Sequence, residues 1–267
     1  MKRTFCLFVI LLISGNVSFA QVSVIGDLTR EATLQPGEKF EGKITLKNRG
    51  QTPWEVNVYK NDYLFYADGT IIYGEPGRAP RSNAGWLSLS PNELTILPDE
   101  TASIFYTLQV PDDQDLSGTY WSIIMIEPTS ETGAQILKDK KHKLKIGIQT
   151  RVRYAVQIIS NIGDTGAPEI DFLDKKLIHQ DGKRILQLDV GNIGEKRLSP
   201  AVWVELYDSH GNKMGRFESQ KKRIYPECSV RYEVDLTEVP TGDYRALVVL
   251  DNGDEHVFGA QYNLGIE

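Results

Sequence analysis

The chain repeats one order of strands and turns. The first copy runs KITLKNRGQTPWEVNVY (43–59) and resumes as LPDETASIFYTLQVPDDQDLSGTYWSIIM (97–125). The second runs LQLDVGNIGEKRLSPAVWVELYD (186–208) and resumes as YPECSVRYEVDLTEVPTGDYRALVVL (225–250). Each copy has a strand, an Asn-x-Gly turn and a Trp-bearing strand, and later Val-Pro and Gly-x-Tyr before an apolar strand. Alternating strands at this spacing predict two β-sandwiches built from one pattern.

The remaining sequence after residue 22 is also typical of strands and tight turns. Turn signals such as ADGT, QDGK and DNGD separate runs of β-branched and aromatic residues, and no long helical period is present. We therefore expect an all-β fold of two tandem immunoglobulin-like β-sandwiches. The Gly/Pro/Asn cluster SNIGDTGAPE (160–169) predicts the boundary, with domains at 21–160 and 161–267.

The first twenty residues have the composition of a secretory signal peptide. Lys2 and Arg3 precede the short apolar run FCLFVILLI, and small residues end at Ala20. We expect cleavage after Ala20 and export, because an uncleaved membrane anchor needs a longer apolar run. Cleavage would remove Cys6 and leave only Cys228, so no intramolecular disulfide is expected. Cys228 lies on an alternating strand and is predicted to be a small buried residue.

Composition excludes several classes of function. A formal net charge of −6 gives no general reason for nucleic-acid binding. His142, His179, His210 and His256 are scattered without metal-ligand spacing, so no metal and no cofactor are expected. No nucleophile elbow, phosphate-binding loop or dinucleotide fingerprint occurs, and we expect a protein that is not an enzyme.

Four aromatic residues and one loop have predicted places in this fold. Tyr120 and Tyr244 each open an apolar strand after a loop, where a sandwich often carries a corner tyrosine bonded to nearby backbone. Trp54 and Trp203 are predicted to fill the two cores. The loop 76–85 is predicted to be exposed. Two interpretations of its arginines, Arg78 and Arg81, stay open: a solvated loop or a grip on an anionic partner.

The most informative segment is HKLKIGIQTRVRYAVQII (142–159). From Leu144 onward its even positions are apolar apart from Thr150, and its odd positions are largely basic or amide. Successive side chains of a strand point to opposite faces, so this is predicted to be one long strand with an apolar face. At about 3.3 Å per residue it would exceed 50 Å, more than one small sandwich needs. Such a strand either joins two domains or offers an unpaired edge to another chain.

This segment resembles the last N-domain strand of the periplasmic pilus-assembly chaperones of the chaperone–usher pathway (PapD-like proteins). LKIGIQTRVRY (144–154) matches the alternating apolar residues and the Gln-Ser/Thr-basic-apolar-basic run of that strand. SPNELTILPDE and VPDDQDLSGTYWSIIMIEP are similar to the Pro-rich and Pro-x-Asp segments of the family. The resemblance covers most of residues 22–160 and implies two immunoglobulin-like domains set as a boomerang.

The resemblance also implies site residues. Leu144, Ile146 and Ile148 match the side chains that the family inserts into an incomplete subunit, whose missing strand the chaperone supplies. Arg153 matches the basic residue that, with an arginine of the first strand, holds the C-terminal carboxylate of the subunit in the cleft. Arg30, in DLTREATL, is the only first-strand candidate.

The sequence therefore predicts a periplasmic, non-enzymatic chaperone that binds exported pilus or surface subunits by β-strand addition along residues 142–154. An outer-membrane usher is a further expected partner, and no integral membrane segment is expected after cleavage. An alternative stays open, because LQPGEKFEGKITLKNRG followed by DGTIIY is also similar to the paired domains of exported WxL-associated proteins. In that case the chain would be an extracytoplasmic adhesion or cell-wall-binding module.

Overall fold

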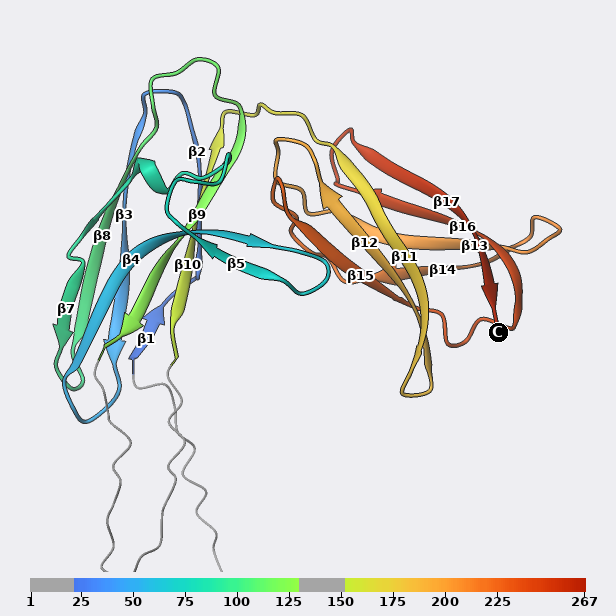
Figure 1. Cartoon of the computed structure of the whole chain (residues 1–267), viewed down its shortest axis with the longest axis horizontal. Coiled ribbons are helices and arrows are strands. Elements are labelled where there is room, and N and C mark those ends of the chain that lie inside the picture. Colours follow the sequence, from blue (N-terminus) through green and yellow to red (C-terminus); the bar gives the residue numbers. More distant parts are fainter. Residues whose placement is uncertain (1–21, 130–151) are drawn as a thin grey trace, which may run out of the picture.

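The computed structural model describes residues 22–129 and 152–267. These residues form two β-sandwiches joined near residue 163 and set at an angle to each other (Figure 1). The predicted all-β class with two tandem immunoglobulin-like domains is confirmed. Within the described ranges, no helix has the length and apolarity that crossing a bilayer requires.

The first domain contains two sheets. One has the order β1 (Val22–Ile25), β3 (Lys39–Asn48), β8 (Thr101–Gln109) and β6 (Leu87–Ser90). The other has the order β2 (Thr29–Leu34), β10 (Tyr154–Ile162), β9 (Gly118–Pro128), β4 (Trp54–Phe65) and β5 (Ile71–Gly74), with β7 (Glu93–Ile96) also paired to β4. A 3-10 turn, η1 (Ala84–Trp86), precedes β6. Only β2 and β10 pair in parallel among the described ladders.

The second domain also has two sheets. One has the order β11 (Ile170–Gln180), β12 (Lys183–Asn192) and β15 (Ser229–Asp235). The other has the order β14 (Lys213–Ser219), β13 (Ala201–Tyr207), β16 (Gly242–Asp251) and β17 (Val257–Ile266). Each domain buries its own apolar core between its sheets. Period-two alternation produces both cores, since inward side chains of each strand meet those of the facing sheet.

The repeated sequence pattern corresponds to a repeated hydrogen-bond pattern. The amide of Asn48 donates from Nδ2 to the carbonyls of Thr52 and Ile96, and its Oδ1 accepts the Gly50 N–H. The amide of Asn192 makes the same set of bonds in the second domain, to Lys196, Ile224 and Gly194. Both asparagines are fully buried. One turn, used twice, thus closes the same corner of each sandwich.

The predicted aromatic positions are confirmed in part. The Tyr244 hydroxyl donates to the Pro240 carbonyl at 2.9 Å, as a corner tyrosine does. Tyr120 instead packs its ring 4.6 Å from that of Trp86. Trp54 packs against the first core, whereas the prediction for Trp203 is wrong. Trp203 alternates with the inward residues of β13, so it faces outward under the guanidinium of Arg216, 3.9 Å from the ring centre.

An extension of β4 together with β5 connects the two domains. This hairpin reaches from the first domain toward the second (Figure 1). It brings Phe65 to a group of buried residues from both domains, which we term the interdomain cluster: Trp121, Ile159, Tyr225 and Cys228, with Tyr63, Leu64 and Phe65 packed against them. The rings of Trp121 and Tyr225 stack with centres 4.3 Å apart. At the hairpin turn, Ala67 N–H donates to Ser229 Oγ at 2.9 Å.

Cys228 is buried within the interdomain cluster, as the sequence predicts. Burial raises the pKa of its thiol to about 12, so the thiolate is strongly disfavoured there. The residue acts as a small apolar filler between the domains.

A second contact between the domains lies near the linker, between the start of β9 and the loop that contains Glu195. Thr119 N–H donates to the Glu195 carbonyl at 2.8 Å, and Gly118 lies directly against that carbonyl. A Cβ on Gly118 would come 2.4 Å from Glu195 O, and Gly118 has a φ of +73°. Glycine is required at this junction both for its backbone conformation and for the close approach of the two domains.

We expect Gly118→Ala to lower the free energy of unfolding by about 2–5 kcal/mol, because backbone strain and overpacking add. Gly69→Ala is the matched control: Gly69 has a φ of +89°, but a Cβ there would meet nothing within 4 Å. The control should lose only about 1 kcal/mol. Urea denaturation of both variants measures the difference, and equal losses would contradict a tight junction.

Candidate functional site

The candidate site is the edge of β10 nearest its beginning. β9 pairs with the whole of β10, from Tyr154 opposite Ile126 to Ile162 opposite Gly118. β2 lies on the other side and pairs only from Gln157 onward, with Gln157 opposite Thr29. Residues 154–156 therefore have a neighbour on one side only, within the part of the chain that the structure describes.

Backbone groups on this edge point away from the sheet. The Gln157 N–H donates to the Leu28 carbonyl, so the backbone groups of odd-numbered residues in β10 face the β2 side. Those of Ala155 face the same side, where β2 has not yet begun. Upstream of Gly26 the chain belongs to β1, which pairs with β3 in the other sheet. This crossing between sheets leaves the edge uncovered.

Side chains of β10 alternate as the sequence predicts. Tyr154, Val156 and Ile158 pack into the first core, which confirms the inward direction of these even positions. Val152, just before the strand, is 39% exposed, and Leu28 is 43% exposed. Leu144, Ile146 and Ile148 lie outside the described residues, so their predicted role stays a prediction.

The two predicted anchor arginines are not brought together. Arg30 lies opposite Ile158 and has the same inward phase as Ala32 and Leu34. Arg153 lies five residues earlier along the strand, about 16 Å away at 3.3 Å per residue. Its guanidinium is 4.0 Å from the carboxylate of Glu127 on β9. In this structure Arg30 and Arg153 thus lie at different places on the sheet. Their guanidinium groups do not converge on one position.

Side chains of both domains instead form the contact beside β2 and β10. Tyr225 donates its hydroxyl to Gln157 Oε1 at 3.0 Å. Burial raises the pKa of Tyr225 to about 12, so this hydroxyl stays protonated and remains a donor. Arg223 lies 3.4 Å from Thr29 Oγ1, and Arg197 donates to Glu31 at 2.7 Å. The outer faces of β2 and β10 therefore contact the second domain directly.

Sequence reasoning missed Arg197, Arg223 and Tyr225. All three are distant in sequence from β2: Arg197 follows the second Asn-x-Gly turn, and Arg223 and Tyr225 flank Ile224, which is bridged to Leu198. Their only signal is the repeated pattern itself, which places GEKRLSP and KRIYPE at corresponding ends of the second sandwich. Their contacts with the first domain can be predicted only when the angle between the domains is known.

The loop 76–85 contributes to the junction. The carboxylate of Asp62 accepts the N–H groups of Gly77, Arg78 and Ala79 at 2.7–2.9 Å, which ties the loop to β4. Arg81 is paired with Glu195 of the second domain and also donates to the Ser117 carbonyl. Arg81 therefore binds the partner domain of its own chain, and Arg78 pairs in solvent with Glu75.

A small polar pocket of about 240 Å³ lies at the same junction. Lys196 there is 2.6 Å from the carboxylate of Asp164, and Thr119 donates to Asn161 at 2.8 Å. Most polar groups of this pocket are bonded to one another. These bonds help to hold the two domains together, and the charges of Lys196 and Asp164 neutralise each other.

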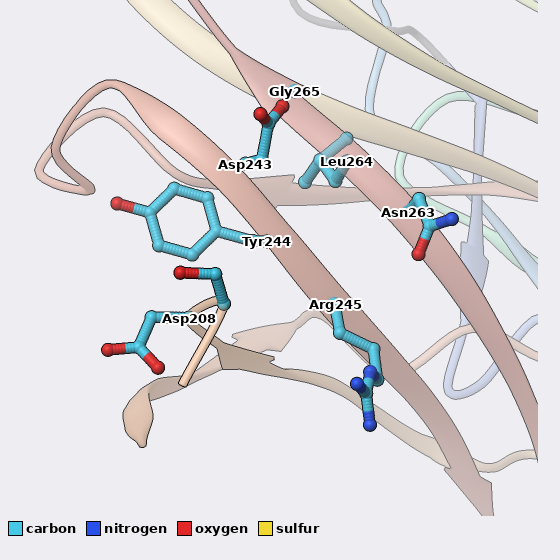
Figure 2. Close-up of a pocket in the computed structure, with 8 residues that line it drawn as sticks. Asp208, Asp243, Tyr244, Arg245, Asn263, Leu264 and Gly265 are labelled. Atoms are coloured by element: carbon cyan, nitrogen blue, oxygen red, sulfur yellow. The ribbon is translucent and has the colours of Figure 1, made fainter. Parts of the chain in front are cut away.

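A second pocket, of about 360 Å³, lies on the second domain between the start of β16 and the end of β17 (Figure 2). The carboxylate of Asp208 accepts bonds from His210 and Asn212 of its own turn, and the Tyr244 hydroxyl is bonded to Pro240. The Asp208 carboxylate and the Tyr244 hydroxyl therefore already form hydrogen bonds with residues near them in the chain. Among the described residues, no three His, Cys, Asp or Glu side chains are grouped as a metal site.

Comparison with known proteins finds similar solved structures only. No protein-family model and no curated protein match the chain. Among solved structures, the class 5 fimbriae chaperone CfaA is 12% identical and covers 92% of this chain and 100% of its own, with a TM-score of 0.48. The CsuC–CsuE chaperone–tip adhesion subunit complex of Acinetobacter baumannii is 11% identical, covers 89% and 97%, and has a TM-score of 0.44. The E. coli chaperone DraB is 11% identical, covers 92% and 98%, and has a TM-score of 0.40. These similar structures include fimbrial chaperones.

Contacts between the domains should weaken in acid. The hydroxyl of Ser117 holds the pKa of Glu195 below its ordinary value of 4.5, with help from Arg81. Burial opposes the same change at Glu31, but Asn161 and Arg197 still lower its pKa. A lowered folded pKa gives stability that is present above the unfolded value and is lost as pH falls through the folded pKa.

We therefore expect the urea midpoint to hold from pH 7 to about pH 5 and to fall below about pH 4.5. Glu195→Gln should lower the midpoint at pH 7 and flatten the acid decline. Glu238→Gln, a change at an exposed carboxylate outside the junction, is the control and should keep the wild-type profile. An unchanged profile for Glu195→Gln would contradict this role of the ion pair.

Proposed function

We propose that the protein is an exported, periplasmic chaperone that captures a pilus or surface subunit by β-strand addition along residues 142–154. The observation that carries the proposal is the one-sided pairing of Tyr154–Val156, with β9 on one side and no described strand on the other. An edge with free N–H and C=O groups is a template for a strand of another chain.

The direction of the side chains supports the same segment. Counting back in steps of two from Val156, whose side chain is buried, reaches Ile148, Ile146 and Leu144. In the proposed complex, these three side chains enter an apolar groove of the subunit. Burial of three aliphatic side chains contributes about 5–8 kcal/mol before ordering costs, enough to select a subunit with an unfilled groove.

Arg153 is proposed to receive an acidic group of the subunit. Its side chain is 52% exposed, and its nearest carboxylate, on Glu127, is 4.0 Å away. A closer carboxylate would form a stronger, charge-assisted bond. Arg30 is the second predicted anchor. Its inward phase on β2 means that its side chain would have to turn outward for the two arginines to act together.

The contacts between the two domains also support the proposal. Aromatic stacking in the interdomain cluster and the close junction at Gly118 hold the second domain beside the outer face of β10. A subunit bound along the edge of β10 would thus lie close to the second domain. An outer-membrane usher is the expected acceptor of the captured subunit.

Ile146→Asp should abolish capture, since a charge cannot enter an apolar groove without a large desolvation cost. The test co-produces the chain with the exported protein encoded beside it and recovers the pair through a tag on the chain. Ile72→Asp is the matched control, because Ile72 is an exposed aliphatic residue on β5 away from the proposed edge. Capture that survives Ile146→Asp would refute strand addition through this segment.

Arg153→Ala should weaken capture by about tenfold, which corresponds to one lost charge-assisted bond. Arg49→Ala, which removes another exposed arginine, should leave capture unchanged. Titration of the purified partner against each variant gives the dissociation constants, and an unaltered constant for Arg153→Ala would remove it from the site. Sedimentation of the wild type with purified cell wall, without subunit capture, would favour the wall-binding alternative.

A further inference from the structure

β17 is a second open edge, at the margin of the second domain. It is the last strand of its sheet and pairs on one side with β16 over all ten residues, from Asp251 opposite Val257 to Gly242 opposite Ile266. That pairing has no shift in register. Figure 1 shows β17 in dark red along the outer margin of the domain. No other strand pairs with it in the described ranges.

β17 lacks the features by which other edges of the same domain are protected. β11 carries a bulge between Phe172 and Asp174 and two lysines, and β14 and β15 each carry several charged residues. The sequence of β17, VFGAQYNLGI, contains no charge and no proline. Charges, bulges and prolines prevent edge-to-edge pairing, so an edge without them is open to another strand.

The pairing of β17 with β16 shows which of its backbone N–H and C=O groups are free. Asn252 N–H donates to the His256 carbonyl, which makes this pair a hydrogen-bonded one. Hydrogen-bonded and non-hydrogen-bonded pairs alternate along an antiparallel ladder, so the odd-numbered residues of β17 direct their backbone groups away from β16. The outward groups belong to Val257, Gly259, Gln261, Asn263 and Gly265.

The side chains of β17 form two rows. The inward row is half-buried and apolar, and it includes Phe258, Tyr262 and Leu264 at the open side of the second core. The outward row consists of the five odd-numbered residues, which are small, amide or aliphatic and are exposed. A strand that fits this edge must therefore carry an apolar row toward the core and an uncharged row toward solvent.

β17 itself meets that description, and we propose that a second copy of this chain pairs with it, β17 against β17, in an antiparallel arrangement. With Gln261 opposite Gln261, residues 257–265 of each strand all pair with β17 of the copy. Odd residues face odd residues, so all outward backbone groups bond across the two-fold axis. Phe258 then lies opposite Leu264, and Ala260 opposite Tyr262, which places apolar beside apolar.

Such pairing would join two four-stranded sheets into one continuous sheet of both copies. The interface is isologous, because the same strand serves both sides, and it closes after two copies. The edge of β10 takes no part in it. The dimer therefore leaves the proposed capture segment accessible and does not depend on the proposed function.

Sedimentation equilibrium tests the proposal on the full-length protein between about 1 and 100 µM, the range of an ordinary reversible dimer. The exported wild type, which begins at residue 21, should show a mass that approaches twice that of its monomer as concentration rises. Gln261→Lys and Gln261→Glu should each weaken the dimer by about tenfold or more, since like charges then face each other at the two-fold axis. An equal mixture of the two variants should restore the dimer.

Gln114→Lys, at an exposed turn of the first domain, is the charge-matched control and should dimerise as the wild type does. Thermal unfolding of all variants checks that each remains folded. A wild type that stays monomeric overturns the proposal, as do variants that stay dimeric. A mixture that stays monomeric overturns the Gln261-centred register. Ile146→Asp should leave the dimer unchanged, which separates this result from the test of subunit capture.

Discussion

Backbone hydrogen bonding at strand edges is the constraint on which this structure depends. Each strand offers N–H and C=O groups on both sides, and a sandwich leaves some of them without a neighbour. Most edges of this protein are short, bulged or charged. Two are different: the beginning of β10, which β2 reaches only at Gln157, and β17, which carries no charge. Capture of a subunit is proposed at the first edge, and pairing with a second copy of the chain at the other.

The first edge exists because the N-terminal strand divides between two sheets. β1 pairs with β3, and after Gly26 the chain crosses to become β2 beside β10. A single continuous first strand would have covered one edge along its whole length. Division of the strand covers the end of β10 and leaves its beginning open, so the topology of the first domain itself creates a place for another chain.

Contact between the domains gives this edge its surroundings. Relative motion is the usual expectation for domains joined by a short linker, unless their interface is apolar and well packed. Here Phe65, Trp121 and Tyr225 form such an interface, and Gly118 permits a second contact at the linker. The extended β4–β5 hairpin is the element that makes the aromatic contact possible. Two separate contacts, the aromatic one and the one at Gly118, therefore join the second domain to the first.

The sequence alone determined the all-β class, the two sandwiches and the phase of β10, because period-two alternation and turn residues act locally. The buried asparagines of both copies were likewise visible as a repeated Asn-x-Gly turn. Tertiary structure decided which face of β13 is buried, so Trp203 lies outside although Trp54 lies inside. It also placed Arg30 inward, away from Arg153, and brought Arg223 and Tyr225 into contact with β2 and β10. These outcomes depend on register between strands and on the angle between domains, which arise from contacts far apart in the chain and leave no local pattern.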